Sequence, residues 1–132
     1  MENLTSHATQ ILLLAFLAVT FLQSGIDKIM DWKGNLTWLT GHFSKTFFKG
    51  MVPLLLGIVL LAEMISGILS AVGAFQFIAA GESNMAFCAA LLSSTTLLLL
   101  LFGQRVAKDY EGAKTIVIYF IPTVFLLYLL QS

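Results

Sequence analysis

Charged side chains are scarce in this chain. Only 11% of its 132 residues are charged, whereas 58% are hydrophobic, and the mean hydropathy is +0.92. Because a soluble domain carries about 25% charged residues, this composition argues against a soluble domain and predicts a membrane protein. Seven basic and seven acidic residues cancel to zero net charge. No basic surplus is left to neutralise phosphates, so nucleic acid is not an expected partner.

Cysteine and metal-binding patterns are also nearly absent. The single Cys88 cannot form an intramolecular disulfide and lies in an apolar run, so we predict a buried structural cysteine. His7 and His42 have no metal-ligand spacing with another His, Cys or carboxylate. The chain has no phosphate-binding glycine loop, CxxC pair, haem-attachment motif or catalytic triad. We therefore expect no metal, and quinone is the only cofactor that we leave open.

What the chain does have is long apolar runs. Four of them are expected as helices, over about 9–30, 51–78, 85–103 and 115–130. A helix needs about 20 residues to cross a bilayer core, and Pro122 in the short fourth run is tolerated when neighbours satisfy the freed carbonyl. The first run lacks a basic leader region and a cleavage site, which favours a retained helix over a signal peptide. The sequence predicts one all-α membrane domain over 1–132, a transmembrane four-helix bundle.

The basic residues fall on one side of this topology. They lie in or beside the first and third loops, at Lys28, Lys33, Lys45, Lys49, Arg105, Lys108 and Lys114. Cytoplasmic loops of membrane proteins carry the excess of Lys and Arg. We therefore expect this side to be cytoplasmic, both termini to be non-cytoplasmic, and the protein to reside in the cell inner membrane.

The first loop, DWKGNLTWLTGHFSKTFFKG over 31–50, mixes aromatic residues with lysines. That mixture is typical of a segment in the headgroup region, with its rings at the acyl boundary. Trp38, His42 and Lys45 are spaced to share one helical face. We predict an interfacial loop that anchors the protein to the membrane, with a partner-docking surface as the alternative.

One ionisable residue, Glu63 in LLAEMISG, interrupts the apolar run 51–78. A charge at the bilayer centre costs about 2.5–3.5 kcal/mol on insertion scales. Because burial disfavours the charged form, we predict a largely protonated side chain that donates to a carbonyl oxygen such as that of a quinone. The alternative is a structural hydrogen bond to another helix, with candidate partners Ser93, Ser94, Thr95 and Thr96.

Small and polar residues share one face with this acid. Spacings of three and four residues produce a stripe of Glu63, Ser66, Gly67, Ser70 and Ala74. Such a stripe lets another helix approach closely, so Glu63 is expected to face the bundle. Gly57 and Gly73 lie off its centre, and no separate role is assigned to them.

A second polar cluster, QSGIDKIMDW over 23–32, ends the first helix. Counted from the same interface, Lys28 lies about 6 Å deep and Glu63 about 16–20 Å deep, an axial gap of about 10–14 Å. We therefore expect no direct salt bridge between them, but a water or ligand in the gap. The alternative for Asp27, Lys28 and Asp31 is a snorkelling, self-paired helix end.

Two motifs carry a resemblance. FLQSGIDKIMDWKG, with Gly25-x-x-Lys28, resembles the opening motif of the DoxX-like membrane proteins, and LLAEMISGILSAVGAF, with Glu63-x-x-x-Gly67, resembles their second-helix motif. The resemblance spans nearly the whole chain, which departs from it in the long aromatic first loop. It implies a small four-helix inner-membrane protein. Some relatives are membrane subunits of redox systems, including thiosulfate:quinone oxidoreductase, and others are parts of larger membrane assemblies.

The first functional hypothesis is a non-catalytic subunit of a larger membrane complex, respiratory or redox. Its partners would be the lipid bilayer and other membrane-protein subunits. A quinone-interacting oxidoreductase subunit of the thiosulfate:quinone type is the alternative, and a small proton-coupled transporter is the second. No catalytic residue is assigned and the isolated chain is not expected to be an enzyme. The candidate intramembrane site is Glu63, Lys28, Asp27, Ser66 and Ser70, with Gly25 and Gly67 at helix contacts.

Overall fold

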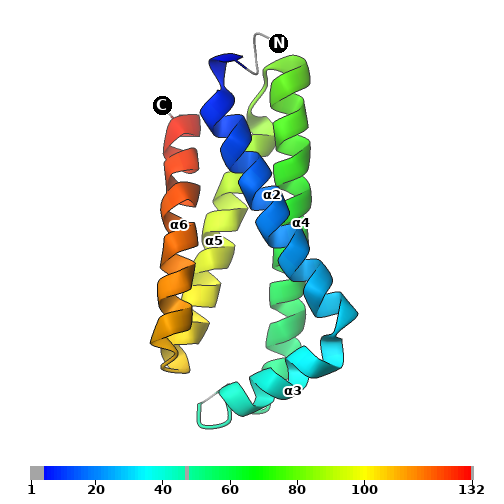
Figure 1. Cartoon of the computed structure of the whole chain (residues 1–132), viewed down its shortest axis with the longest axis vertical. Coiled ribbons are helices and arrows are strands. Elements are labelled where there is room, and N and C mark those ends of the chain that lie inside the picture. The colour runs from blue at the N-terminus through cyan, green and yellow to red at the C-terminus, as the bar shows by residue number, and fades with distance from the viewer. Residues whose placement is uncertain (1–4, 47, 132) are drawn as a thin grey trace.

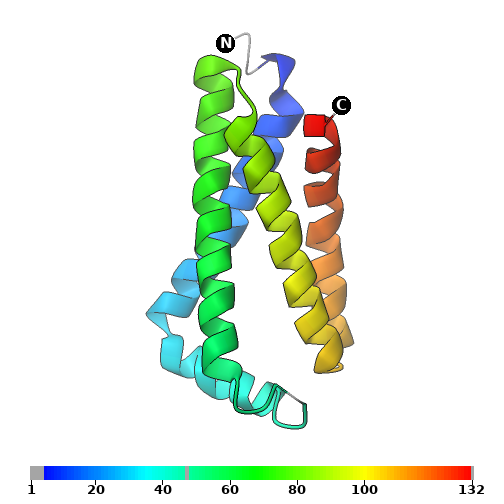
Figure 2. The same ribbon diagram turned by 180° about the vertical axis from the view of Figure 1, so that it is seen from behind.

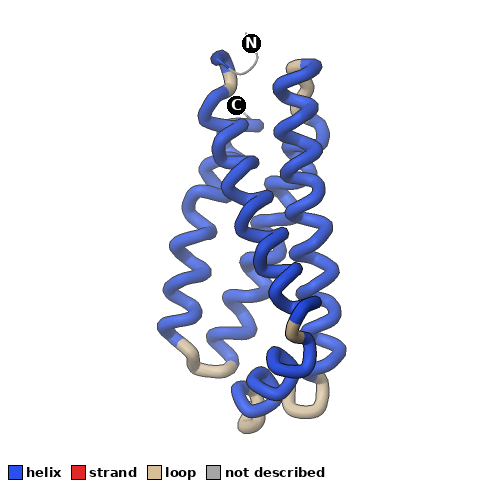
Figure 3. Tube along the Cα trace, turned by 45° about the vertical axis from the view of Figure 1, so that its right-hand side comes forward, coloured by secondary structure: helices blue, strands red, loops and turns tan. Residues whose placement is uncertain are grey.

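The computed structural model describes residues 5–46 and 48–131, so Phe47 of the first loop lies outside the described residues. The described chain is helical throughout, with short connections (Figures 1 and 3). In order, the helices are α2 (Ala8–Met30), α3 (Trp32–His42), α4 (Val52–Ala80), α5 (Asn84–Val106) and α6 (Tyr110–Gln131). Helices α2, α4, α5 and α6 are long and apolar enough to cross a membrane. The predicted all-α, multi-pass bundle is therefore confirmed.

The helix ends follow local sequence signals. Pro53 lies in the first turn of α4, where its missing N–H is not needed. Gly81 ends that helix with a left-handed φ of 71°. Helix α6 continues through Pro122 without a break. The start of α2 and the end of α6 lie at one end of the bundle, whereas α3 and the α5–α6 turn lie at the other (Figure 1).

Helix α3 occupies much of the first loop. Asp31 separates it from α2 and caps it, accepting a hydrogen bond from the Gly34 N–H at 3.3 Å. The helix ends at His42, so the predicted helical face holds for Trp38 and His42, whose rings stack with centroids 4.5 Å apart. Lys45 lies beyond the helix, and its inclusion in that face was wrong because the chain turns after His42.

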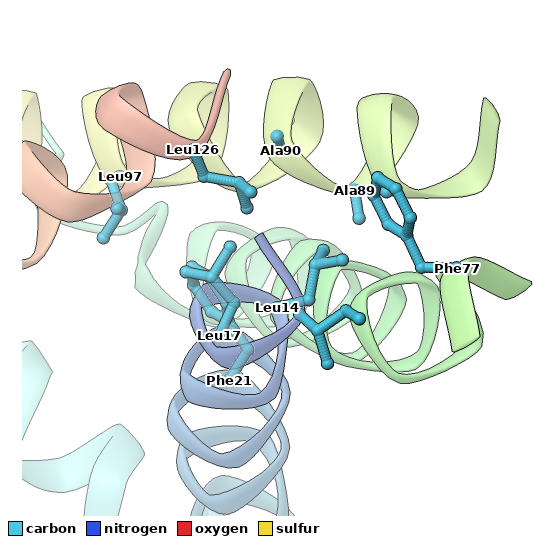
Figure 4. Close-up of a cluster of buried hydrophobic side chains, with 10 residues drawn as sticks. Leu14, Leu17, Phe21, Phe77, Ala89, Ala90, Leu97 and Leu126 are labelled. Atoms are coloured by element: carbon cyan, nitrogen blue, oxygen red, sulfur yellow. The ribbon is translucent and has the colours of Figure 1, made fainter. Parts of the chain in front are cut away.

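The main cluster of buried hydrophobic side chains lies in one half of the bundle. Helix α2 packs on α4, α4 on α5 and α5 on α6, while α2 and α6 meet less extensively. The core lies in the half that holds the start of α2 and the end of α6 (Figure 4). Its fully buried members include Leu14, Leu17, Phe21, Ala89 and Leu126. Toward α3, the ribbons of α4 and α5 diverge (Figure 2). The fold thus has a packed half and a splayed half.

Glycines mark the closest helix contacts. A Cβ at Gly67 would lie 2.7 Å from the Leu22 side chain and 3.0 Å from its backbone nitrogen, and a Cβ at Gly25 would collide with the Met64 side chain. A Cβ at Gly73 would lie 2.8 Å from the backbone Cα of Ala86. Gly73 therefore has a packing role that its position in the stripe did not indicate, because the close approach there is to α5.

Cys88 is exposed on α5 rather than buried. The prediction of a buried cysteine was wrong because every residue of a membrane helix can be apolar, so an apolar run does not distinguish the inward face from the lipid-facing one.

Candidate functional site

The centre of the candidate site is an ion pair between α2 and α4. Lys28 Nζ lies 2.9 Å from Glu63 Oε1, and the two side chains are 19% and 3% exposed. The stripe prediction that Glu63 faces inward is confirmed by this burial. The prediction that the two residues make no direct contact is wrong.

The reason is the register of the two helices. Gly25 lies against Met64 and Leu60, so one turn further along α2 the Lys28 side chain reaches the level of Glu63. Helix α4 also begins well beyond the end of α2, because α3 fills the distance between them (Figure 1). The depth estimate assumed that both helices begin at one level, and it therefore placed Glu63 too far from Lys28.

The pair is not saturated by hydrogen bonds. The Lys28 ammonium donates to Ser24 Oγ at 2.7 Å. It also lies 2.9 Å from Glu63 Oε1, which is its ion-pair partner. A lysine ammonium carries three N–H donors, so this group can donate to a ligand or water in addition to Ser24 and Glu63.

In the described chain, hydroxyl groups of α4 and α5 around the pair make hydrogen bonds within and between these two helices, and not with the ion pair. Ser66 and Thr96 share a hydrogen bond of 3.3 Å between α4 and α5, and Ser70 donates to the Ser66 carbonyl at 2.7 Å. Within the described residues, none of the four candidate partners on α5 bonds to Glu63. Ser94, Thr95 and Thr96 donate to carbonyls four residues earlier in α5. Ser66 and Ser70 are thus buried, and neither lines either of the two cavities described below.

A cavity of about 560 Å³ extends from the ion pair toward α3. It lies in the splayed half, between α2, α4 and α5. Most of its lining is aliphatic or aromatic, including Leu56, Val59 and Phe102. Polar groups converge at its inner end, where Ser24, Lys28 and Glu63 meet. Ligand pockets in proteins have this volume and this division between an apolar wall and a few polar groups.

Helix α3 covers the outer end of this cavity. Trp38 and Phe43 both line it. His42 Nε2 lies 3.1 Å from Gln104 Oε1 and 3.7 Å from Asp109 Oδ2, which ties the end of α3 to the α5–α6 connection. The first loop is therefore part of the wall of the site as well as an aromatic segment at one end of the bundle.

A second cavity of about 320 Å³ adjoins the first and lies between α2, α5 and α6. Asp27 lines this cavity and not the larger one, and it is exposed. The structure thus separates Asp27 from Lys28, although the two are adjacent in sequence. Glu63 lines both cavities.

No three His, Cys, Asp or Glu side chains come together as a metal site within residues 5–46 and 48–131. Comparisons with protein-family models, with curated proteins and with solved structures find no match to this chain.

Some features of the site had no signal in the sequence. The pairing of His42 with Gln104 joins residues 62 positions apart, and neither residue belongs to a motif. Phe102 and Tyr119 look like ordinary membrane-helix residues, but they line the two cavities. Only the arrangement of the helices distinguishes such residues from those that face lipid.

Proposed function

We propose that this protein is a DoxX-like inner-membrane protein that binds a quinone-class ligand in the larger cavity, as a subunit of a membrane redox complex. The observation that carries the proposal is the Lys28–Glu63 pair at the inner end of an apolar cavity of about 560 Å³. An ionisable group inside a membrane is a functional-site hypothesis by default, and here it is joined by a cavity that fits a ring-sized ligand.

The polar end of the cavity matches an oxygen-bearing head group. The Lys28 ammonium is a donor for a carbonyl oxygen, and the Glu63 carboxylate beside it is an acceptor for a hydroxyl. A quinone presents the first of these groups and a quinol presents the second. This assignment revises the role expected from the sequence, in which Glu63 was the donor. The protonation state of Glu63 stays a prediction.

The apolar end of the cavity suits an isoprenoid or alkyl tail. Three lining residues, Ile58, Leu99 and Phe102, are also 48–55% exposed, so the cavity meets the surface between α4 and α5. In a bilayer that surface faces lipid. A tail would leave the cavity there while the head group stays beside the ion pair, so entry from the membrane requires no aqueous step.

The orientation in the membrane follows from charge. All seven basic residues lie at the α3 end of the bundle. By the positive-inside rule we place this end in the cytoplasm and both termini outside. A C-terminal alkaline phosphatase fusion should then be active in cells and a C-terminal green fluorescent protein fusion dark; the reverse pattern would invert the topology.

Ligand binding is testable through Trp38, which lines the cavity. In a Trp32→Phe background, Trp38 is the only tryptophan, and a short-chain benzoquinone added to lipid nanodiscs should quench it saturably. Glu63→Gln should raise the apparent Kd about tenfold or more, which corresponds to loss of about 1.4 kcal/mol. Glu82→Gln, an exposed change at the opposite end, is the control and should leave the Kd unchanged. Unsaturable quenching that is equal in all three proteins would mean simple partitioning into lipid and would overturn the proposal.

A further inference from the structure

The smaller cavity differs in chemistry from the larger one. Six of its eleven lining residues carry polar groups: Thr20, Gln23, Ser24, Asp27, Glu63 and Tyr119. A cavity of about 320 Å³ with this lining has room for several waters and partners for them. An apolar ligand has little to gain in it. The smaller cavity is therefore better suited to water than to an apolar ligand.

Glu63 lies where the two cavities adjoin, together with Ser24, Leu100 and Ile116. Its side chain is 3% exposed, yet it lines both cavities while Oε1 stays paired with Lys28. A carboxyl group in this position can contact water on one side and a head group on the other. Such an arrangement is required of a group that passes protons between water and a bound ligand.

The polar residues of the smaller cavity follow α2 inward from the α3 end. Asp27 lies in the last turn of α2 and is exposed. Thr20 lies seven residues earlier, about 10 Å deeper at 1.5 Å per residue. Gln23 lies between them on the same helix. Glu63 is level with Lys28, and Ser24, which accepts a hydrogen bond from the Lys28 ammonium, also lines this cavity. A file of waters from Asp27 past Ser24 would therefore connect the bundle surface to Glu63.

We propose that the smaller cavity is a hydrated path by which protons reach Glu63 from the α3 side of the membrane. In this step a proton moves from water to a carboxylate oxygen of Glu63, or back, and no electron moves with it. The inference rests on the proposed function, because a quinone in the larger cavity would take up protons on reduction to quinol and release them on oxidation. The titratable groups that line the path are Asp27 on α2, Glu63 on α4 and Tyr119 on α6, while α5 contributes only leucines. Lys28 contacts Glu63 from the side of the larger cavity.

Aqueous access is measured by cysteine modification in a Cys88→Ala background. Thr20→Cys and Gln23→Cys place thiols in the path, and Ile26→Cys is the matched control. Ile26 is 50% exposed and lines neither cavity, although it lies nearer the α3 end than Gln23. The probe is a small, charged, membrane-impermeant methanethiosulfonate, which reacts with hydrated thiolates. We expect both path variants to react at least tenfold faster than the control. Equal rates at all three positions, or protection at both path positions, would overturn the proposal.

Access to the Glu63 position itself is measured with Glu63→Cys. Adding Gln23→Phe should fill the path and slow its modification at least tenfold, whereas adding Ile26→Phe should not. An undiminished rate with Gln23→Phe would show that water reaches position 63 by another route and would contradict the proposal. If Glu63→Cys does not fold, the rates at Thr20 and Gln23 decide alone. A failure of the Trp38 quenching assay removes the quinone and leaves these rates as expected, so the two proposals fail separately.

Discussion

Lys28 Nζ lies 2.9 Å from Glu63 Oε1, and this contact joins α2 to α4 outside the main hydrophobic cluster of the bundle. Removing one partner of a buried ion pair is far more costly than replacing both, because the remaining charge is left without compensation. The contact therefore holds two helices together and also keeps a donor and an acceptor at the inner end of a cavity. Its consequences can be measured separately for stability and for binding.

The two single replacements of this pair should differ. Lys28→Met leaves an almost fully buried carboxyl without its cation and should lower the free energy of unfolding by about 3–5 kcal/mol. Glu63→Gln should cost less, since Lys28 is 19% exposed and can extend its ammonium toward the interface. The double variant Lys28→Met with Glu63→Leu should recover much of the loss. Steric-trap unfolding in bicelles measures all three, and additive effects in the double variant would contradict a coupled pair.

Gly73→Ala should destabilise the bundle. The new methyl group would lie 2.8 Å from the backbone of Ala86, and backbone cannot move aside as a flexible side chain does. We expect a loss of about 1–3 kcal/mol in the same unfolding assay. Gly57→Ala is the control, because a Cβ there meets nothing within 4 Å. That variant should be neutral or gain about 0.5–1 kcal/mol of helix stability. Equal effects at the two glycines would mean that α4 and α5 are not in close contact at Gly73.

Val59→Phe should fill the larger cavity without unfolding the protein. Val59 lines this cavity and not the smaller one. We expect quinone affinity, measured by Trp38 quenching, to fall about tenfold or more, with little change in thermal stability. Leu61→Phe makes the same kind of change on the face of α4 where the side chain is 63% exposed, and it should leave affinity unchanged. Equal affinity in the two variants would place the ligand outside the cavity.

His42→Ala should free the end of α3. It removes the 3.1 Å hydrogen bond to Gln104 and the 3.7 Å approach to Asp109. A hydrogen bond of this kind contributes about 0.5–1.5 kcal/mol, so the bundle should remain folded while α3 becomes more mobile. Spin labels at Thr40 and Glu111 should report a broader distance distribution by pulsed electron resonance. Lys45→Ala, at an exposed residue beyond α3, should keep the narrow distribution; broadening in both variants would rule out His42 as the tie.

Composition and run length were sufficient to predict the membrane bundle. A run of about 20 apolar residues that crosses a bilayer is expected to be a helix, because every backbone polar group must be paired within the bilayer. The inward face of α4 was also predictable, since Glu63, Ser66, Gly67 and Ser70 recur at helical spacing and all four are buried. Ala74 is only half-buried, and Gly73 takes the equivalent place in the contact with α5.

The ion pair and the two cavities were not predictable, because they depend on offsets between helices. A depth count along each helix cannot show that α3 lets α4 start beyond the end of α2, which brings Lys28 level with Glu63. Nor can periodicity show where neighbouring helices diverge. Val59 and Leu61 are both ordinary apolar residues in sequence, and only the splayed half of the bundle distinguishes their surroundings.

The most direct test of the proposed ligand site is to locate a bound quinone on the protein. A photoreactive benzoquinone analogue, illuminated in proteoliposomes and mapped by mass spectrometry, should attach to residues around the ion pair, such as Ser24, Val59 and Leu100. Excess unmodified quinone should suppress this labelling. Attachment spread over the lipid-facing side chains of α4, such as Leu61 and Ile65, and insensitive to competing quinone would contradict a quinone site at the Lys28–Glu63 pair.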